Sequence, residues 1–336
     1  MDYCGLDLGK TSSRLCVVDR ARNILREQDV ATREKALRKA FGRKQKLRVV
    51  IEASNNAFWV AELLEELGHE LRVVDPNRTK AIGASLIKTD KLDARWLAYL
   101  CAADLLATVR VPTREERIAR MPVTARDGLI RARTRLINAV RGITTSEGIV
   151  VQQCKPERLL EMVEACQDQL PEGMYEALLP LLDGIDALNI CVDTGTVALR
   201  ERADTDPALQ RLQTIPGVGP ITASIYAGAI IDPSRFSSGR DVGAYLGLVP
   251  SLYQSGATMR RGRITKRGNR QARWALCMAG NAVLNCKKST PLVDWAKGLE
   301  GRIGRKKAII ATARKLASVM WAVWSKEVEY DARLVA

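Results

Sequence analysis

Four acidic residues near the start of the chain have the type and spacing needed to bind a divalent cation: Asp7, Glu52, Asp90 and Asp93. Asp7 and Glu52 each lie at the end of a short apolar, β-forming run. Asp90 and Asp93 are three apart in a segment with helical spacing, so both carboxylates share one helix face. Carboxylate oxygens are ligands that Mg²⁺ and Mn²⁺ prefer. The four acids therefore predict a metal site.

Each acid also has a structural interpretation. Asp7 could be a turn former at a strand end, Glu52 a surface residue and Asp90 the N-cap of its helix. One acid in such a place is most often structural. Four acids that a single order of strands and helices would bring together favour a metal site. The single histidine, His69, follows Gly68 in what the sequence predicts to be a polar turn, so catalysis built on histidine is not expected.

The elements that must position these acids follow the order β-β-β-α-β-α-β-α. This is the order of the ribonuclease H-like fold, whose first and fourth strands lie side by side, which would bring Asp7 and Glu52 together. The apolar periodicities and turn signals place the elements as follows: strands over 3–9, 14–19, 23–30, 47–52 and 71–76, and helices over 33–41, 58–67, 77–84 and from 89 onward.

Composition limits the class of protein. A formal net charge of +15 and a pI near 9.6 indicate a polyanionic partner, chiefly nucleic acid, although ribosomal or membrane-surface roles stay open on charge alone. The 46% hydrophobic and 27% charged residues are typical of a globular protein. Eight cysteines without metal or disulfide spacing predict reduced thiols in a cytoplasmic protein. We expect no membrane span and no signal peptide.

A length of 336 residues predicts two or three domains, and we place them at 1–108, 109–207 and 208–336. The middle domain begins with an arginine-rich, helix-compatible stretch that we expect to be broken at Pro122 and Gly128. A second helical region over 157–202 is typical of an antiparallel helical hairpin or a dimerising coiled coil. Most of the arginines are expected on a solvated face, with a phosphate-contacting helix as the alternative.

Two glycines beyond the middle domain, Gly217 and Gly219, lie in a sequence typical of a helix-hairpin-helix, Ile215-Pro216-Gly217-Val218-Gly219-Pro220-Ile221-Thr222-Ala223. Glycine allows backbone N–H groups to approach a phosphate, and the following helix N-terminus favours negative charge. The alternative is an ordinary turn between helices.

Further on, Ser255 lies in Tyr253-Gln254-Ser255-Gly256, which the sequence places in a polar loop where a Ser-Gly pair is by default a turn. A basic run follows, too dense for chance scatter, and we expect it to contact backbone phosphates. Its members are Arg260, Arg261, Arg263, Lys266, Arg267, Arg270 and Arg273.

Taken together, these motifs resemble the DEDD transposases of insertion sequences, namely the insertion-sequence one-ten family, to which the Piv DNA invertases belong. The resemblance covers essentially the whole chain. It is carried by Gly5-Leu6-Asp7, Glu52, Lys88-Thr89-Asp90-Lys91-Leu92-Asp93-Ala94-Arg95, Pro216-Gly217-Val218-Gly219-Pro220, Gly247-Leu248-Val249-Pro250, Tyr253-Gln254-Ser255-Gly256 and Lys266-Arg267-Gly268-Asn269.

The resemblance implies an α/β N-terminal domain of the RuvC-like, ribonuclease H-like type, a helical coiled-coil middle and a mostly helical C-terminal transposase domain. It implies that the family's catalytic acids map onto these four positions and that Ser255 is the nucleophile. From the donor chemistry we expect Mg²⁺ or Mn²⁺, with two ions that could clamp the scissile phosphate. The resemblance also implies donor and target DNA as partners, a noncoding bridge RNA as guide, and dimers that assemble into tetramers with an active site shared between subunits.

The expected function is therefore that of a metal-dependent DNA recombinase, cytoplasmic and associated with the nucleoid when active, that rejoins DNA through a serine-linked intermediate. One alternative is a junction-resolving nuclease that uses only the carboxylates. The other is a non-catalytic nucleic-acid-binding protein whose first domain is a scaffold. The target sequences and the guide RNA cannot be read from the sequence.

Overall fold

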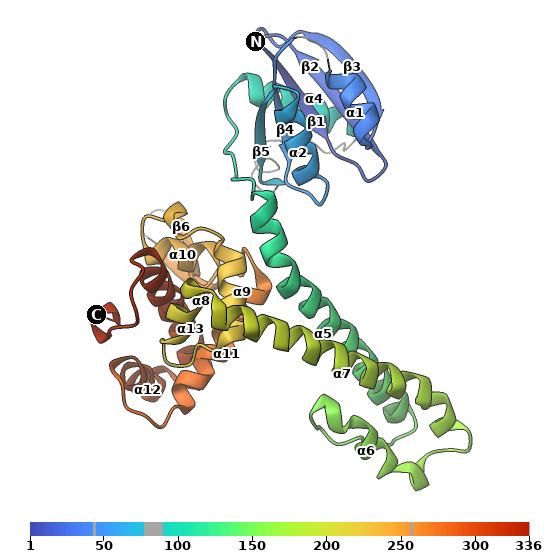
Figure 1. Ribbon diagram of the computed structural model, residues 1–336, viewed down its shortest axis with the longest axis vertical. Coiled ribbons are helices and arrows are strands. Elements are labelled where there is room, and N and C mark those ends of the chain that lie inside the picture. The colour runs from blue at the N-terminus through green and yellow to red at the C-terminus, as the bar shows by residue number, and fades with distance from the viewer. Residues whose placement is uncertain (43–44, 77–89, 256–257, 336) are drawn as a thin grey trace. The chain divides into compact units, whose positions relative to one another are not determined.

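The computed structural model describes residues 1–42, 45–76, 90–255 and 258–335. Its contacts divide the chain into two compact units, Met1–Thr113 and Arg114–Ala336 (Figure 1). For Asp90, Ser255 and Arg261 the backbone is described and the side chain is not. The short helix predicted over 77–84 lies outside the described residues.

The first unit is built on a five-stranded mixed sheet with the strand order β3-β2-β1-β4-β5. Strand β1 lies antiparallel to β2 and parallel to β4, with Leu6 opposite Ile51. The predicted adjacency of the first and fourth strands is therefore confirmed. The strands are β1 (Asp2–Asp7), β2 (Ser12–Val18), β3 (Ile24–Ala31), β4 (Leu47–Glu52) and β5 (Glu70–Val74).

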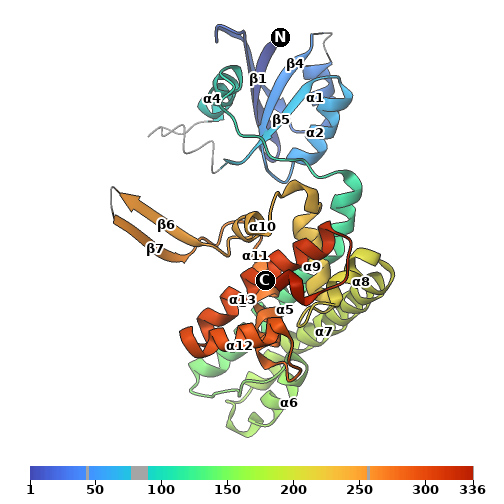
Figure 2. The same ribbon diagram turned by 90° about the vertical axis from the view of Figure 1, so that its left-hand side faces the viewer.

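Helices cover both faces of this sheet. Figure 2 shows α4 (Asp90–Ala102) on one face, with α1 (Glu34–Phe41) and α2 (Ala57–Glu66) on the other. Strand β4 is apolar at consecutive positions because its two faces enter two different cores: Val49 and Ile51 pack on the side of α1 and α2, whereas Val50 packs with residues of α4.

Gly5 sets how closely α4 approaches the sheet. A Cβ atom at this position would lie 2.1 Å from the carbonyl oxygen of Ala94 and 2.5 Å from the backbone nitrogen of Ala98. The backbones of β1 and α4 are therefore in direct contact, which no residue with a side chain would permit.

His69 is buried, so its predicted place in a polar turn is wrong. Its Nδ1 accepts a hydrogen bond from the Leu47 N–H at 3.2 Å, and its Nε2 donates to the Phe41 carbonyl oxygen at 2.9 Å. The ring satisfies two backbone groups where β4 begins and α1 ends, and its role is structural.

The second unit begins with two long helices, α5 (Arg114–Ser146) and α7 (Met174–Thr205), which pack as an antiparallel hairpin. The region 157–202, predicted to form a helical hairpin or a coiled coil, contains most of the long helix α7, whose hairpin partner is α5, the helix before that region. Several of its arginines are not on a solvated face: the Arg126 Nε donates to Thr196 Oγ1 at 2.7 Å, and the Arg133 Nη1 donates to Asn189 Oδ1 at 2.8 Å. Burial lowers the pKa of Arg126.

The predicted break of α5 at Pro122 and Gly128 is wrong, because the helix runs through both positions. An internal proline removes one backbone hydrogen bond and crowds the preceding turn. Packing along the length of α5 against α7, and of Val123 in the core of the second unit, offsets that cost. Helix α7 passes Pro180 in the same way.

The remaining helices apart from α6 share one apolar core and form the helical body of this unit, as predicted. Helix α6 packs instead in a separate apolar cluster with α5 and α7. A two-stranded hairpin that the sequence did not predict, β6 (Pro250–Ser255) and β7 (Thr258–Ile264), extends from it (Figure 2). None of the described helices is long and apolar enough to cross a membrane. The helices are α6 (Leu159–Glu164), α8 (Pro207–Gln213), α9 (Pro220–Ile230), α10 (Gly239–Tyr245), α11 (Arg270–Asn285), α12 (Pro291–Ile303) and α13 (Arg305–Ser325), with 3₁₀ turns at Pro156–Arg158, Gln167–Gln169, Pro233–Arg235 and Ala332–Val335.

The contact at Gly5 predicts a stability effect. Gly5→Ala should destabilise the protein by about 1–3 kcal/mol, because the added methyl group meets backbone atoms that cannot turn aside. Gly128→Ala, in open space on α5, should instead stabilise it by about 0.5–1 kcal/mol. Urea unfolding followed by circular dichroism measures both. An unchanged midpoint for Gly5→Ala would contradict the close approach of α4.

Candidate active site

Asp7 and Glu52 lie at the same edge of the sheet. Leu6 and Ile51 are the last paired residues of the parallel strands β1 and β4, and the two acids follow them directly. Neighbouring strands are about 4.8 Å apart. Side chains alternate along a strand, and Gly5 and Val50 face α4. Asp7 and Glu52, each two positions further on, therefore face α4 as well.

Asp90 and Asp93 lie at the start of α4, on the side that faces the sheet. The buried stripe of this helix contains Ala94, Leu97 and Ala98. Positions 90 and 93 precede Ala94 and Leu97 by four residues each, so they continue this stripe by one turn.

The direction of α4 brings its first turn to the edge that carries Asp7 and Glu52. The Cys101 Sγ lies 3.9 Å from the Arg48 carbonyl oxygen, where β4 begins. From Arg48 to Glu52 the strand advances about 13 Å, and from Cys101 back to Asp93 the helix covers about 12 Å. Measured along the direction of β4, Asp93 therefore lies about as far from Arg48 as Glu52 does.

The donor set suits a hard cation, since every candidate ligand is a carboxylate oxygen. Within the described residues, no three His, Cys, Asp or Glu side chains are gathered closely enough to hold a metal ion. The side chain of Asp90 is outside that description. At the level of the backbone, Asp7 and Glu52 lie at the carboxyl ends of β1 and β4, and Asp90 and Asp93 lie in the first turn of the helix that covers this face of the sheet.

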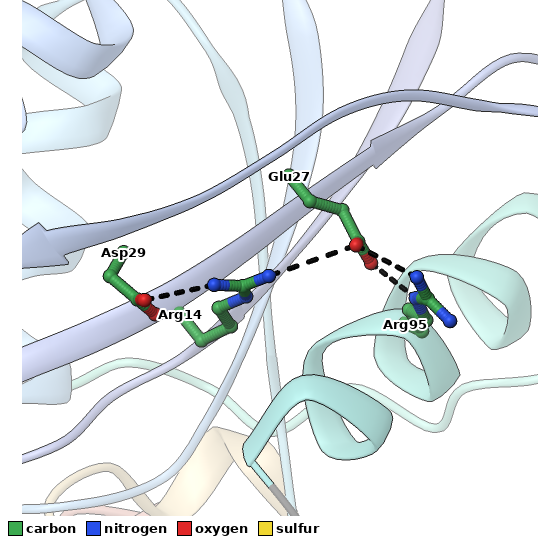
Figure 3. A network of polar contacts seen from close by, with 4 residues as sticks. All are labelled: Arg14, Glu27, Asp29 and Arg95. Carbon is green, nitrogen blue, oxygen red and sulfur yellow. Dashed lines mark hydrogen bonds and ion pairs between the residues drawn. The ribbon is translucent and has the colours of Figure 1, made fainter.

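Next to these acids lies a polar network that the sequence analysis missed (Figure 3). Arg95 on α4 and Arg14 on β2 both pair with Glu27 on β3, and Arg14 also pairs with Asp29. Arg95 could have been suspected from its place just after Asp93. Glu27 carries no sequence signal, because an acid in a polar edge strand is ordinary.

Ser255 is the last residue of β6, opposite Thr258, at the tip of the two-stranded hairpin. The predicted polar loop is therefore wrong for this residue, because Tyr253 and Gln254 continue the strand ladder. Tyr253 is 69% exposed. Gly256 lies outside the described residues. The serine thus lies at the end of a projecting element, with an exposed aromatic ring two positions before it.

Two interlocked turns form the base of this hairpin and explain two of the sequence motifs. Gly247 has φ +70°, and a Cβ there would lie 2.1 Å from the Arg267 carbonyl oxygen. Gly268 has φ +79°, and its Cβ would lie 2.0 Å from the Tyr245 carbonyl oxygen. Asn269 caps α11 by accepting the Ala272 N–H at 3.0 Å. These residues orient the hairpin.

The basic run divides into two groups. Arg273 differs from the others because its Nη1 donates to the carbonyl oxygens of Leu246, Arg267 and Gly268, at 3.1, 2.7 and 3.0 Å. Burial lowers its pKa. Arg273 thus holds the turns at the base of the hairpin. The side chain of Arg261 is not described, and the exposed members are Arg260, Arg263, Lys266, Arg267 and Arg270.

Gly217 and Gly219 also have different surroundings. Gly217 has φ +81°, and a Cβ there would lie 2.6 Å from Val283 Cγ2 and 2.8 Å from the Ala279 carbonyl oxygen, so this glycine packs against α11. Gly219 precedes α9 and has open space where a Cβ would be. The turn between α8 and α9 therefore offers Gly219, and not Gly217, for a close approach of a ligand.

An acid-bearing sheet edge and a basic hairpin in one chain are typical of enzymes that act on nucleic acids. Family comparisons name that class: residues 4–146 match the model for IS110-type DEDD transposases, described as "Transposase", and residues 209–292 match "Transposase IS116/IS110/IS902 family". The chain belongs to the IS110 family of transposases, enzymes that cleave and transfer DNA.

Individual relatives agree with this assignment. The chain is 31% identical to the "Probable family 20 transposase" of Pseudomonas aeruginosa, over 97% of both chains. It is 28% identical to the transposase for insertion sequence element IS1328 of Yersinia enterocolitica, over 95% of both. It is also 32% identical to the pilin gene-inverting protein of Moraxella bovis, over 37% of this chain and 38% of that protein. The resemblance inferred from the sequence motifs is confirmed.

The two glycines of the α8–α9 turn predict opposite results. Gly217→Ala should lower the free energy of unfolding by about 1–3 kcal/mol through strain and overpacking against α11. Gly219→Ala should change it by less than about 0.5 kcal/mol. Chemical denaturation measures both, and DNA affinity measured on the same samples tests the phosphate interpretation. A loss of affinity confined to Gly217→Ala, with stability unchanged, would contradict the packing role.

Proposed function

We propose that this transposase is a metal-dependent, site-specific DNA recombinase that uses Ser255 to hold the cut strand covalently. The observation that carries the proposal is the common edge of β1 and β4, where Asp7 and Glu52 face the first turn of α4. The order of elements and the strand order support a ribonuclease H-like, RuvC-like fold for the first unit. The likeness to a gene-inverting protein supports recombination over simple hydrolysis.

In this proposal Asp7, Glu52, Asp90 and Asp93 hold Mg²⁺ or Mn²⁺, with two ions as the expected number. Such ions neutralise charge on the scissile phosphate and polarise the attacking and leaving oxygens. The side chains supply oxygen ligands only, which suits hard cations. The rigid sheet and the backbone contact at Gly5 support the positions from which these ligands extend.

Ser255 supplies the nucleophilic oxygen. The Ser255 hydroxyl gives up its proton as its oxygen forms a bond to phosphorus and the bond from phosphorus to a deoxyribose oxygen breaks. The leaving oxygen takes up a proton, so no proton is gained or lost overall. The reverse attack by a sugar hydroxyl on another strand restores the serine and joins DNA without ATP. A serine hydroxyl is a weak nucleophile unless it is activated, so this step needs Ser255 to meet the carboxylate site. As the family resemblance implies, we place that meeting between subunits of a dimer or tetramer.

The nucleic acids in this proposal are donor DNA, target DNA and a noncoding guide RNA. The net charge of +15 supports such partners. The exposed basic residues of β7 and of the turn before α11 are the proposed phosphate contacts, together with the N-terminus of α9 beside Gly219. A junction-resolving nuclease remains the alternative outcome of the test below.

The decisive prediction concerns the covalent intermediate. Wild-type protein with DNA, guide RNA and Mg²⁺ should give protein-linked DNA on a denaturing gel. Ser255→Ala should give none while it still binds DNA, and Asp7→Asn should give neither adduct nor cleavage.

Two results would contradict this assignment. An adduct that persists in Ser255→Ala would mean that another residue is the nucleophile. Free cut ends without an adduct, lost only in Asp7→Asn, would identify a carboxylate-only nuclease.

A second prediction concerns the basic hairpin. Arg260→Gln with Arg263→Gln should weaken DNA binding for all sequences and reduce the slope of log affinity against log salt by about 0.9 per lost phosphate contact. Arg158→Gln is the control for loss of an exposed arginine elsewhere, because Arg158 precedes α6 and pairs with Glu161 of that helix. Equal slopes for the hairpin variant and the wild type would mean that the hairpin arginines only face solvent.

A further inference from the structure

A half-buried acid, Glu27, connects the sheet to the helix that carries Asp90 and Asp93. It lies on β3 opposite Cys16, on the face that α4 covers, and its side chain is 13% exposed. Both carboxylate oxygens pair with Arg95 of α4: Oε2 accepts from Nη2 at 2.8 Å, and Oε1 accepts from Nε in a short contact (Figure 3).

Two further residues flank Glu27 on the sheet side. Arg14 Nη2 lies 3.7 Å from its Oε2, and Cys16 lies opposite Glu27 in the β2–β3 ladder. Burial, with the negative charge of Glu27, raises the pKa of Cys16 to about 11. Arg14 is held in turn by Asp29 at 2.9 Å.

The ends of this network lie beside the candidate metal ligands. Arg14 is the cross-strand neighbour of Asp7 in the β1–β2 ladder. Arg95 lies two residues after Asp93 on α4. The contacts of Glu27 therefore connect Arg14, the neighbour of Asp7, to α4, the helix that carries Asp90 and Asp93.

The contact at Gly5 alone does not fix the orientation of α4. A helix that rests on a glycine is held at a set distance but can still roll about its axis or slide along the strand. Apolar packing of α4 against Val50 and Cys16 limits these motions but has no fixed direction. A two-point arginine–carboxylate pair adds a directional restraint, because both N–H groups must point at both oxygens at once. A small roll would turn the first turn of α4 away from Asp7 and Glu52.

We propose that Glu27 is a positioning residue of the carboxylate site, which sets the affinity for the divalent cation by orienting α4 through Arg95. This inference rests on the proposed function of the four acids. Groups that orient metal ligands without touching the metal change its affinity by about 10–100-fold when they are removed. A role limited to stability would change the unfolding midpoint and leave cation affinity unaltered.

The test uses Glu27→Gln, which keeps the size of the side chain but removes its charge and one acceptor. Mn²⁺ binding to the full-length protein, followed by the electron paramagnetic resonance signal of free Mn²⁺, should weaken by about 10–100-fold. The Mg²⁺ concentration for half-maximal DNA cleavage should rise by a similar factor, with most of the rate recovered at saturating Mg²⁺.

Asp29→Asn is the matched control. Asp29 belongs to the same network but pairs with Arg14 at its exposed end, and among the described side chains it has no ion pair or hydrogen bond with α4. The Mn²⁺ affinity of Asp29→Asn should therefore equal that of the wild type. Arg95→Gln removes the same ion pair from the helix side and should reproduce the loss of affinity, whereas Arg95→Lys, which keeps the charge, should be intermediate. If Glu27→Gln does not fold, the two Arg95 variants decide.

Asp7→Asn separates the two proposals. If Asp7→Asn loses Mn²⁺ binding and both Glu27→Gln and Arg95→Gln bind Mn²⁺ as tightly as the wild type, the positioning role is wrong and the carboxylate site stands. If Asp7→Asn binds and cleaves like the wild type, the carboxylate site is itself wrong.

Discussion

The first unit of this transposase depends on one close approach, that of α4 to β1 at Gly5. The helix backbone rests directly on the strand because the glycine has no side chain, with Ala94 and Ala98 on the helix side. This contact brings small residues of α4 against the sheet, and larger ones such as Leu97 fill the space beside it. That contact sets the distance of Asp90 and Asp93 from the sheet and the side of the helix on which they lie.

The charged residues follow a related constraint. The excess of 15 positive charges suggests a uniformly cationic surface for nucleic acid, yet several arginines serve the fold. Arg126 and Arg133 hydrogen-bond inside the α5–α7 hairpin, and Arg273 holds three carbonyl groups at the base of the β6–β7 hairpin. A guanidinium with several N–H groups suits such positions because backbone carbonyls in tight turns need donors.

Motifs that resemble functional signatures also have backbone reasons. Gly247 and Gly268 lie in turns that press against each other, and Gly217 packs against α11. All three glycines have a left-handed backbone, and the absence of a Cβ allows each turn to contact its neighbour directly. The basic hairpin extends from this rigid base, so its orientation is set by glycines far from its tip.

Sequence patterns were enough to predict the order of elements in the first unit, the neighbouring first and fourth strands, and the family. Alternating and helical periodicities with clear glycine and proline stops are local signals, and the acids at strand ends followed from them. Four features became known only from the folded chain: α5 continues through Pro122, His69 is buried, Ser255 ends a strand, and Glu27 pairs with Arg95. These features depend on contacts between residues far apart in the chain, such as the 68 positions between Glu27 and Arg95. Local propensity cannot report them, because the packing energy that offsets a proline or orders an ion pair arises only when distant elements meet.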